Sequence, residues 1–276
     1  MRLDEIGYWT EVKLDIVREY AVAYSAILAN QQKVPLTHIY VDAFSGAGQH
    51  LSRTSGEVVP GSPLSVLSVE PKFAEYHFID LNQHKLDHLR ELTASRDGVY
   101  LYNEDCNSVL IDEVFPRARY EDYRRALCLL DPYGLHLDWR LMHTAGHMKS
   151  VEIFLNFPVM DMNMNVLWAN PDKVLPEQAA RMTRFWGDES WREAAYTTDL
   201  QQPNLFGEAE KASNEAVADA FRHRLREVAG FKYVPEPLPM RNKTNAVVYY
   251  LFFASQNQVG AKIASAVFSK YRNRGT

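Results

Sequence analysis

The chain has 276 residues, 46% of them hydrophobic and 24% charged, which is the balance of an ordinary globular protein. Its formal net charge of −5 argues against a protein that coats nucleic acid nonspecifically, although a local basic groove is compatible with it. No run approaches the roughly 20 apolar residues of a membrane span, and the N-terminal residues lack the apolar core of a signal peptide. We therefore expect a cytoplasmic protein that does not enter a membrane.

The cysteines and histidines give no metal-binding pattern. Cys106 and Cys128 lie far apart in sequence and form no C-x-x-C pair. The two histidine pairs at helical spacing lack the glutamate of an H-E-x-x-H motif. We expect no metal site.

The first half of the chain alternates helical and strand-like patterns. Residues 9–30 carry apolar side chains at helical spacing, so that residues 1–35 are expected to form an N-terminal helical segment. Gly61-Ser62-Pro63 is typical of a helix start, with Ser62 as N-cap. The expected strands are 38–41, 76–79, 99–102, 126–130 and 151–155, and the expected helices between them are 62–69, 82–94, 108–115 and 139–148. Strands linked by helices predict a doubly wound parallel sheet with right-handed crossovers.

The pattern breaks after the fifth strand. Residues 160–207 are rich in Met, Trp, Pro and Asn and are expected to form a helical or irregular insertion, either a substrate lid or, for most of the aromatic residues, a small core. A helix over 208–229, antiparallel strands at 231–234 and 247–254, and a helix over 259–271 are expected to follow. Seven strands with an antiparallel end favour an α/β, Rossmann-like class I methyltransferase fold. We expect one domain over residues 1–276.

A glycine loop follows the first strand of this predicted sheet. The strand ends in Asp42, and Gly46 and Gly48 come in the turn directly after it. Glycine allows a ligand to approach the backbone closely and tolerates positive φ. The predicted cofactor-binding residues in this loop are Asp42, Ala43, Phe44, Ser45, Gly46 and Gly48.

Each of the first four predicted strands ends in or just before a carboxylate. After Asp42 these are Asp80, Asp105 and Asp131. Ligands of doubly wound sheets bind beyond the carboxyl ends of the strands, and carboxylates there suit the hydroxyl, amino and sulfonium groups of S-adenosylmethionine better than a pyrophosphate. The third glycine of the dinucleotide motif G-x-G-x-x-G is also absent. We expect Asp80 to bind the ribose and Asp105 the adenine amino group, although any single Asp can also be a turn or N-cap residue.

The most specific chemical motif is Asp131-Pro132-Tyr133-Gly134, which follows an apolar strand. It resembles motif IV of the methyltransferases that act on exocyclic amino groups of nucleic acid bases. The resemblance implies that Asp131 and Pro132 orient an acceptor amine, that Tyr133 stacks on the base, and that the base is unpaired or flipped. Adenine N6 and guanine N2 both stay open, because Pro132 stands alone and Gly134 follows the tyrosine. Ser62 and Asn156 are expected to contribute to substrate binding with Gly134, and Asn156 to orient the substrate or Asp131, or only to start a loop.

Several of these elements together resemble the three-Cys-motif partner (TcmP) family of class I methyltransferase-like proteins. They are residues 40–48, Gly61-Ser62-Pro63, residues 78–80, the Asp105 loop, residues 131–134, residues 156–158 and residues 249–255. The resemblance implies a methyltransferase fold and a separate partner protein that carries the three cysteines. The sequence thus predicts a methyltransferase acting on RNA or DNA, and the alternative is a non-catalytic partner module.

Overall fold

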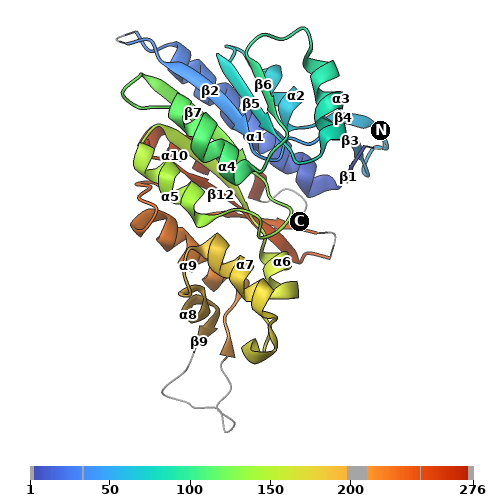
Figure 1. The fold of residues 1–276 in the computed structure, drawn as a ribbon, viewed down its shortest axis with the longest axis vertical. Coiled ribbons are helices and arrows are strands. Elements are labelled where there is room, and N and C mark those ends of the chain that lie inside the picture. Colours follow the sequence, from blue (N-terminus) through green and yellow to red (C-terminus); the bar gives the residue numbers. More distant parts are fainter. Residues whose placement is uncertain (1–2, 33, 198–209, 243, 273–276) are drawn as a thin grey trace.

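The computed structural model describes residues 3–32, 34–197, 210–242 and 244–272, and its centre is a seven-stranded sheet (Figure 1). The strands are β2 (Thr37–Asp42), β5 (Glu75–Ile79), β6 (Val99–Tyr102), β7 (Arg124–Leu130), β8 (Val151–Phe157), β11 (Leu238–Arg241) and β12 (Val247–Ala254). Their spatial order is β11-β12-β8-β7-β2-β5-β6. The first five are parallel, and β12 is antiparallel to both of its neighbours. The predicted fold class is confirmed.

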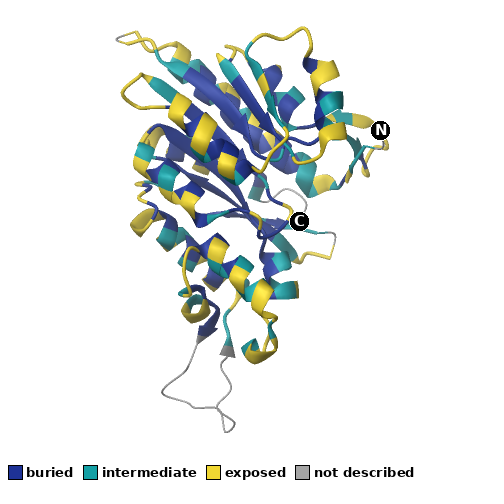
Figure 2. Ribbon diagram, viewed as in Figure 1, coloured by how far each residue is buried: buried dark blue, intermediate teal, exposed yellow. Residues whose placement is uncertain are grey.

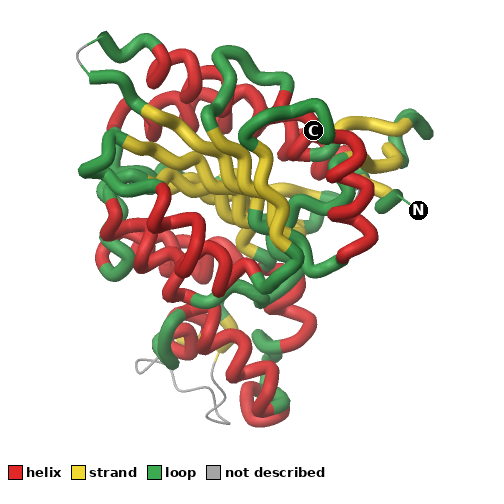
Figure 3. Tube along the Cα trace, turned by 45° about the horizontal axis from the view of Figure 1, so that its top comes forward, coloured by secondary structure: helices red, strands yellow, loops and turns green. Residues whose placement is uncertain are grey.

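Helices cover both faces of the sheet, as Figure 3 shows. One face packs against α1 (Tyr8–Ala29), α2 (Ser62–Leu67), α3 (Gln83–Thr93) and α10 (Gln258–Arg272). The other face packs against α4 (Cys106–Val109), α5 (Trp139–Met148), α6 (Val159–Asn165), α7 (Pro176–Trp186), α8 (Trp191–Ala195) and α9 (Asn214–Glu227). The central strands are therefore buried on both faces (Figure 2). This burial explains why the residues Ala126–Leu130 of β7 read as a continuous apolar run rather than an alternating one.

Two expectations about the C-terminal part were wrong. The strand that pairs with β12 lies at Leu238–Arg241 and not at 231–234, where Tyr233 makes only an isolated bridge with Ser255. The helix expected over 208–229 begins at Asn214, after Glu210–Lys211 pairs as β10 with Tyr196–Thr197 of β9. Ser213 ends that extended segment, because its side chain accepts a hydrogen bond from the Ala216 N–H as N-cap of α9. Residues 198–209 lie outside the described residues.

The segment between the glycine loop and α2 is more ordered than predicted. It forms a hairpin of β3 (Gln49–Ser52) and β4 (Val58–Pro60), and β3 also pairs with β1 (Glu5–Ile6). Gly61, with extended backbone, precedes the helix, so that Ser62 is its first residue and not the N-cap.

The expected helix over 108–115 begins earlier. It starts with α4 at Cys106 and continues as a π-helical turn, η1 (Leu110–Val114), and a 3₁₀ turn, η2 (Phe115–Arg117). Asp105 is its N-cap, with the side chain accepting a hydrogen bond from the Asn107 N–H at 2.7 Å. A polar side chain at the start of the helix therefore decides where it begins.

The insertion after β8 is mostly helical in its described part and ends in β9. Beyond α6 it contains a 3₁₀ turn, η3 (Pro171–Lys173), then α7 and α8. Phe185, Trp186 and Trp191 are at most 2% exposed and belong to the same apolar core as the sheet face beneath them. These rings therefore offer no stacking surface, and the core they fill is the main one rather than a separate small one.

Candidate active site

A cleft of about 840 Å³ opens at the carboxyl ends of the parallel strands. Its walls come from α1, the loops after β2 and β7, the end of β8, α6 and β12. The predicted site residues that line it are Phe44, Gly46, Ser62, Asp131, Pro132, Tyr133 and Asn156. The parallel sheet brings them together because the ends of β2, β7 and β8 meet at one edge.

Asp131 is held at the floor of this cleft by two side chains. Its Oδ2 atom is ion-paired with Lys13 of α1, and its Oδ1 atom accepts a hydrogen bond of 2.9 Å from Asn156 Nδ2. Lys13 is only 4% exposed, and its Nζ atom also lies 5.5 Å from the centre of the Tyr249 ring. A buried cation needs such partners, and here they fix the orientation of the carboxylate.

The sequence analysis missed Lys13, although the sequence carries a signal. Lys13 stands among Trp9, Val17 and Tyr20 on what is otherwise an apolar face of α1. A lysine on a face that must be buried is rare unless it has a partner. That partner, Asp131, is 118 residues away and is not visible in the helical pattern.

Pro132, Tyr133 and Asn156 form the side of the cleft next to Asp131. The Asn156 amide nitrogen, which donates to Asp131, also lies 3.4 Å from the Pro132 carbonyl oxygen. The Tyr133 side chain is far more accessible, because the residue is 77% exposed. Lys85 of α3, which the sequence analysis also missed, lies 6.0 Å from the Tyr133 ring centre and pairs with Asp4 at 2.5 Å. Two acceptor oxygens and an accessible ring thus stand side by side.

Asp42 lies beneath the cleft rather than in its wall. It is fully buried, and one of its oxygens accepts a hydrogen bond of 3.2 Å from the Phe44 N–H. Burial raises the pKa of Asp42 to about 7, against the lowering effects of the Ser62 hydroxyl and the Phe44 N–H. Asp42 therefore supports the glycine loop from below.

The two glycines of the loop have different surroundings. A Cβ atom on Gly46, at φ +61°, would meet no atom of the described residues within 4 Å and would fill space at the cleft wall. A Cβ atom on Gly48, at φ +79°, would instead lie 2.7 Å from Leu89 Cδ1 of α3. The close packing of the loop on α3 therefore requires glycine at position 48, and the prediction that Gly48 contacts a cofactor stays a prediction.

Neighbouring contacts hold the loop to β5. The Gly46 N–H donates to Asp80 Oδ2 at 2.9 Å, while Asp80 Oδ1 accepts from the Asn82 N–H at 2.7 Å. Ser45 is buried and donates both its N–H and its hydroxyl to the Ile79 carbonyl, and Ala43 is buried beside it. These contacts position the loop, and they bring Asp80 directly next to it.

Asp105 and Gly134 lie outside the cleft wall. Asp105 is exposed and caps α4, the alternative that was considered for any single Asp. Gly134 is buried against α6, where a Cβ atom would lie 3.0 Å from Asp161 Oδ2. Of the four strand-end carboxylates, Asp131 alone lines the cleft, Asp80 touches its glycine loop, Asp42 lies below it, and Asp105 follows the outermost strand.

The seven-stranded, mostly parallel sheet with its antiparallel β12 defines a Rossmann-like fold of the class I methyltransferase type. No family model and no curated protein matches the sequence. Among solved structures, protein LPL1258 from Legionella pneumophila is similar with a TM-score of 0.54 and 12% identity, over 95% of this chain and 94% of that one. At this identity the similarity shows the fold alone.

Two further solved structures are methyltransferases by name but have TM-scores below 0.5. One is a putative methyltransferase from Escherichia coli, with a TM-score of 0.37 and 13% identity over 88% of each chain. The other is the N-methyltransferase NodS from Bradyrhizobium japonicum, with a TM-score of 0.42 and 10% identity over 90% of this chain and 97% of that one. The reaction must therefore be argued from the site.

Within the described residues, no helix has the length and apolar character needed to cross a membrane. The same part of the chain contains no group of three or more His, Cys, Asp or Glu side chains arranged to hold a metal ion. Both cysteines are buried as free thiols.

Proposed function

We propose that this protein is an S-adenosylmethionine-dependent methyltransferase that acts on an exocyclic amino group of a nucleic acid base. One observation carries the proposal. Asp131 Oδ1 and the Pro132 carbonyl oxygen lie 2.9 and 3.4 Å from a single nitrogen, Asn156 Nδ2, beside the exposed Tyr133. The two acceptors therefore lie close together, and each keeps a further lone pair for an amine in the cleft.

This arrangement suits the chemistry of a conjugated amine. Such an amine is a poor nucleophile, because its lone pair is delocalised into the ring. Hydrogen bonds from both N–H groups to Asp131 and Pro132 would direct the lone pair away from the two acceptors and hold the nitrogen in position. Tyr133 is accessible for stacking on the base. Lys13 and Asn156 would act by fixing the Asp131 carboxylate rather than by touching the base.

The residues at the glycine loop fit S-adenosylmethionine, which when bound supplies an electrophilic methyl group. The open space at Gly46 admits a ligand against the backbone, and Phe44 lines the cleft next to it. Asp80 keeps free lone pairs for ribose hydroxyls beyond its two backbone contacts. Asp42, Asp80 and Asp105 follow three neighbouring strands, β2, β5 and β6. Two strand spacings amount to about 10 Å. This span suits an extended nucleoside with its adenine near Asp105.

A second hollow next to the cleft favours a polymeric substrate. It has a volume of about 870 Å³ and shares Thr10, Val248 and Tyr249 with the catalytic cleft. Tyr8 and Trp9 bring two aromatic rings to it, with centroids 5.4 Å apart, and Arg53 and Arg241 bring two cations. Aromatic rings beside cations are the usual surface for single-stranded nucleic acid. We infer that nucleotides flanking the target base bind there.

The resemblance to three-Cys-motif partner proteins supports a methyltransferase that works together with a second protein. It also supports the other candidate, a non-catalytic partner module with a methyltransferase-like fold. The contacts at Asp131 favour the catalytic candidate. If the two acceptor oxygens had a purely structural role, an accessible aromatic ring such as Tyr133 would not be needed beside them.

Two measurements test the proposal in sequence. Titration calorimetry should detect binding of S-adenosylhomocysteine to the purified protein, and complete absence of binding would remove the methyltransferase assignment. A tritiated-methyl transfer assay should then label total tRNA, rRNA or DNA. Label only in protein or metabolites would overturn the nucleic acid substrate, and no label in any fraction would favour the non-catalytic module.

A further inference from the structure

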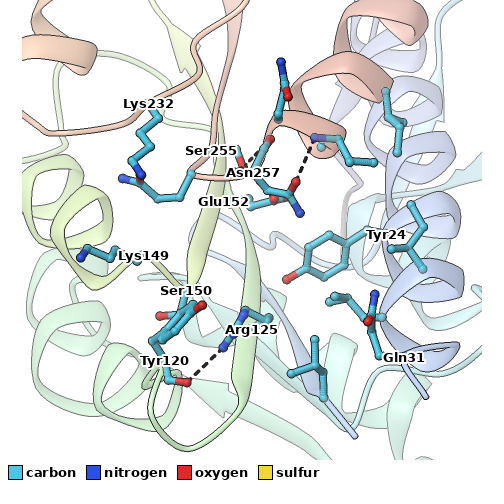
Figure 4. Close-up of a pocket in the computed structure, with 18 of the residues that line it drawn as sticks. Tyr24, Gln31, Tyr120, Arg125, Lys149, Ser150, Glu152, Lys232, Ser255 and Asn257 are labelled. Atoms are coloured by element: carbon cyan, nitrogen blue, oxygen red, sulfur yellow. Dashed lines mark hydrogen bonds between the residues drawn. The ribbon is translucent and has the colours of Figure 1, made fainter. Parts of the chain in front are cut away.

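A second pocket lies at the opposite edge of the sheet from the catalytic cleft. It has a volume of about 470 Å³ and is bounded by the C-terminal half of α1, the first residues of β7 and β8, and the N-terminus of α10 (Figure 4). Its size falls in the range of small-molecule sites. Tyr24 in this pocket and Lys13 in the cleft are eleven residues apart on α1, which corresponds to about 16 Å along the helix. The two sites are therefore separate.

Two buried hydroxyl groups in this pocket have no hydrogen-bond partner among the described residues. They are Tyr24 Oη and Ser150 Oγ, and their residues are 7% and 2% exposed. In Figure 4 the Tyr24 hydroxyl extends from the α1 side toward the wall that carries Arg125, Ser150 and Glu152. Buried hydroxyls without partners are unusual, because they lose their bonds to water without replacement. A ligand with acceptor oxygens would satisfy both.

The pocket is also rich in positive charge. Arg125, Lys149 and Lys232 line it, and none of the three forms an ion pair in the described part of the chain. The Arg125 guanidinium carbon lies over the Tyr120 ring, 3.9 Å from its centre. Val259 and Gly260 bring the N-terminal turn of the fifteen-residue helix α10 to the same pocket, so that its positive end adds to the field.

The only acid among the pocket residues is Glu152, and it is already satisfied. It accepts hydrogen bonds from the Tyr20 hydroxyl on one oxygen and from Ser255 on the other, the latter at 2.7 Å. Each oxygen keeps a further lone pair for a donor such as a sugar hydroxyl. A Cβ atom on Gly260 would lie 2.8 Å from Glu152 Oε1, which shows how closely α10 approaches the acid. The pocket thus offers cations and donors on one side and an acceptor on the other.

We propose that this pocket binds a small phosphate monoester that also carries hydroxyl groups. Three cations against one acid favour a dianion over a single carboxylate. The phosphate oxygens would accept from Ser150, Tyr24 and Arg125, and the hydroxyl-bearing remainder would lie toward Glu152. The site is independent of the methyl-transfer proposal, because it shares no lining residue with the catalytic cleft.

Ribose 5-phosphate is the probe for titration calorimetry, with ribose and inorganic phosphate as comparisons. We expect ribose 5-phosphate to bind at least tenfold more tightly than either, and Arg125→Gln and Ser150→Ala each to weaken it at least tenfold. Arg90→Gln, which removes an equal charge from an exposed ion pair on α3, should change nothing. Equal binding of ribose, or equal effects of the Arg125 and Arg90 variants, would overturn the site.

A second comparison identifies the source of the phosphate. A short oligonucleotide with a 5′-phosphate should bind no more tightly at this site than its 5′-hydroxyl form, with Ser150→Ala as the reporter variant. A phosphate-dependent gain that Ser150→Ala abolishes would assign the pocket to a nucleic acid end and overturn the small-molecule ligand. Arg125 also donates hydrogen bonds to backbone carbonyls, so that its replacement can disturb the fold. If the Arg125→Gln variant does not fold, Tyr24→Phe replaces it in the comparison.

Discussion

Helix α1 supplies a side-chain partner to one acid at each edge of the sheet, and the two partners differ in charge. At the carboxyl edge Lys13 gives Asp131 a cation, and at the amino edge Tyr20 gives Glu152 a neutral hydroxyl. The two donors are seven residues, or about 10 Å, apart on the same helix face. The Asp131 side chain remains 24% exposed to a cleft, whereas Glu152 as a residue is 8% exposed and burial raises its pKa.

The difference shows what each acid can do. Asp131 has a charged partner, an amide donor and access from the cleft, so that it can bind a ligand group by exchanging contacts. Glu152 accepts hydrogen bonds from two hydroxyl groups and ties α1 and the residue after β12 to β8, so that only its remaining lone pairs face the pocket beside it. Accessibility together with the charge of the partner therefore distinguishes the proposed reactive edge at Asp131 from the edge at Glu152, where the acid mainly holds elements together.

The largest expected effect concerns Asp42, the buried acid below the reactive edge. An acid whose folded pKa is about 7, against about 3.9 unfolded, contributes most stability below pH 4 and loses it as the pH rises through 7. Urea unfolding of the wild type should therefore lose on the order of 4 kcal/mol relative to Asp42→Asn between pH 4 and pH 8. Parallel pH profiles for the two proteins would contradict the burial of this acid.

The second effect tests the reactive edge itself. Asp131→Asn retains the shape of the side chain but removes the charge and one acceptor, and we expect methyl transfer to fall by about 10²- to 10³-fold. S-adenosylhomocysteine affinity should stay within about threefold, since Asp131 is proposed to contact the acceptor. Asp112→Asn, an exposed acid of η1, is the control. Equal loss of cofactor binding and transfer would place Asp131 in the cofactor site.

A third experiment compares the two partners that α1 supplies. Tyr20→Phe leaves the buried Glu152 with Ser255 as its only donor within the described part of the chain and should cost about 2–3 kcal/mol of unfolding free energy. Lys13→Met should cost about 1 kcal/mol, because water in the cleft can solvate the part-exposed Asp131. Urea unfolding at pH 7 measures both. If Lys13→Met costs more, the ion pair is structurally dominant and our distinction between the edges fails.

The smallest effect separates two glycines within the reactive edge. Gly48→Ala should destabilise the fold by about 2 kcal/mol through positive φ and contact with Leu89, and Gly46→Ala by about 1 kcal/mol through φ alone. Only Gly46→Ala should in addition weaken S-adenosylhomocysteine binding by a factor of about ten or more. Thermal unfolding and calorimetry give the two readouts. Weakened binding in the Gly48 variant alone would reverse our assignment of the two residues.

Most of the sheet could be predicted because its strands are short apolar runs, the first four of the parallel ones ending at or just before a carboxylate, and because helices of ordinary length separate them. The segments that were misplaced lack such patterns. Leu238–Arg241 contains Pro239, which argues against a strand, yet it is tolerated at the edge of the sheet. The segment at 231–234 has the better strand composition but pairs only through Tyr233.

The sequence by itself determined the parallel sheet, the glycine loop at its carboxyl edge, and the motif Asp131-Pro132-Tyr133, because periodicity and turn chemistry are local properties. The tertiary structure alone decided that Lys13 pairs with Asp131, and that Gly48 packs on α3 while Gly46 faces the cleft. It also decided that Tyr24, Ser150 and Arg125 enclose one pocket. Each of these facts depends on contacts between residues distant in the chain, and the packing of helices on the sheet sets such contacts.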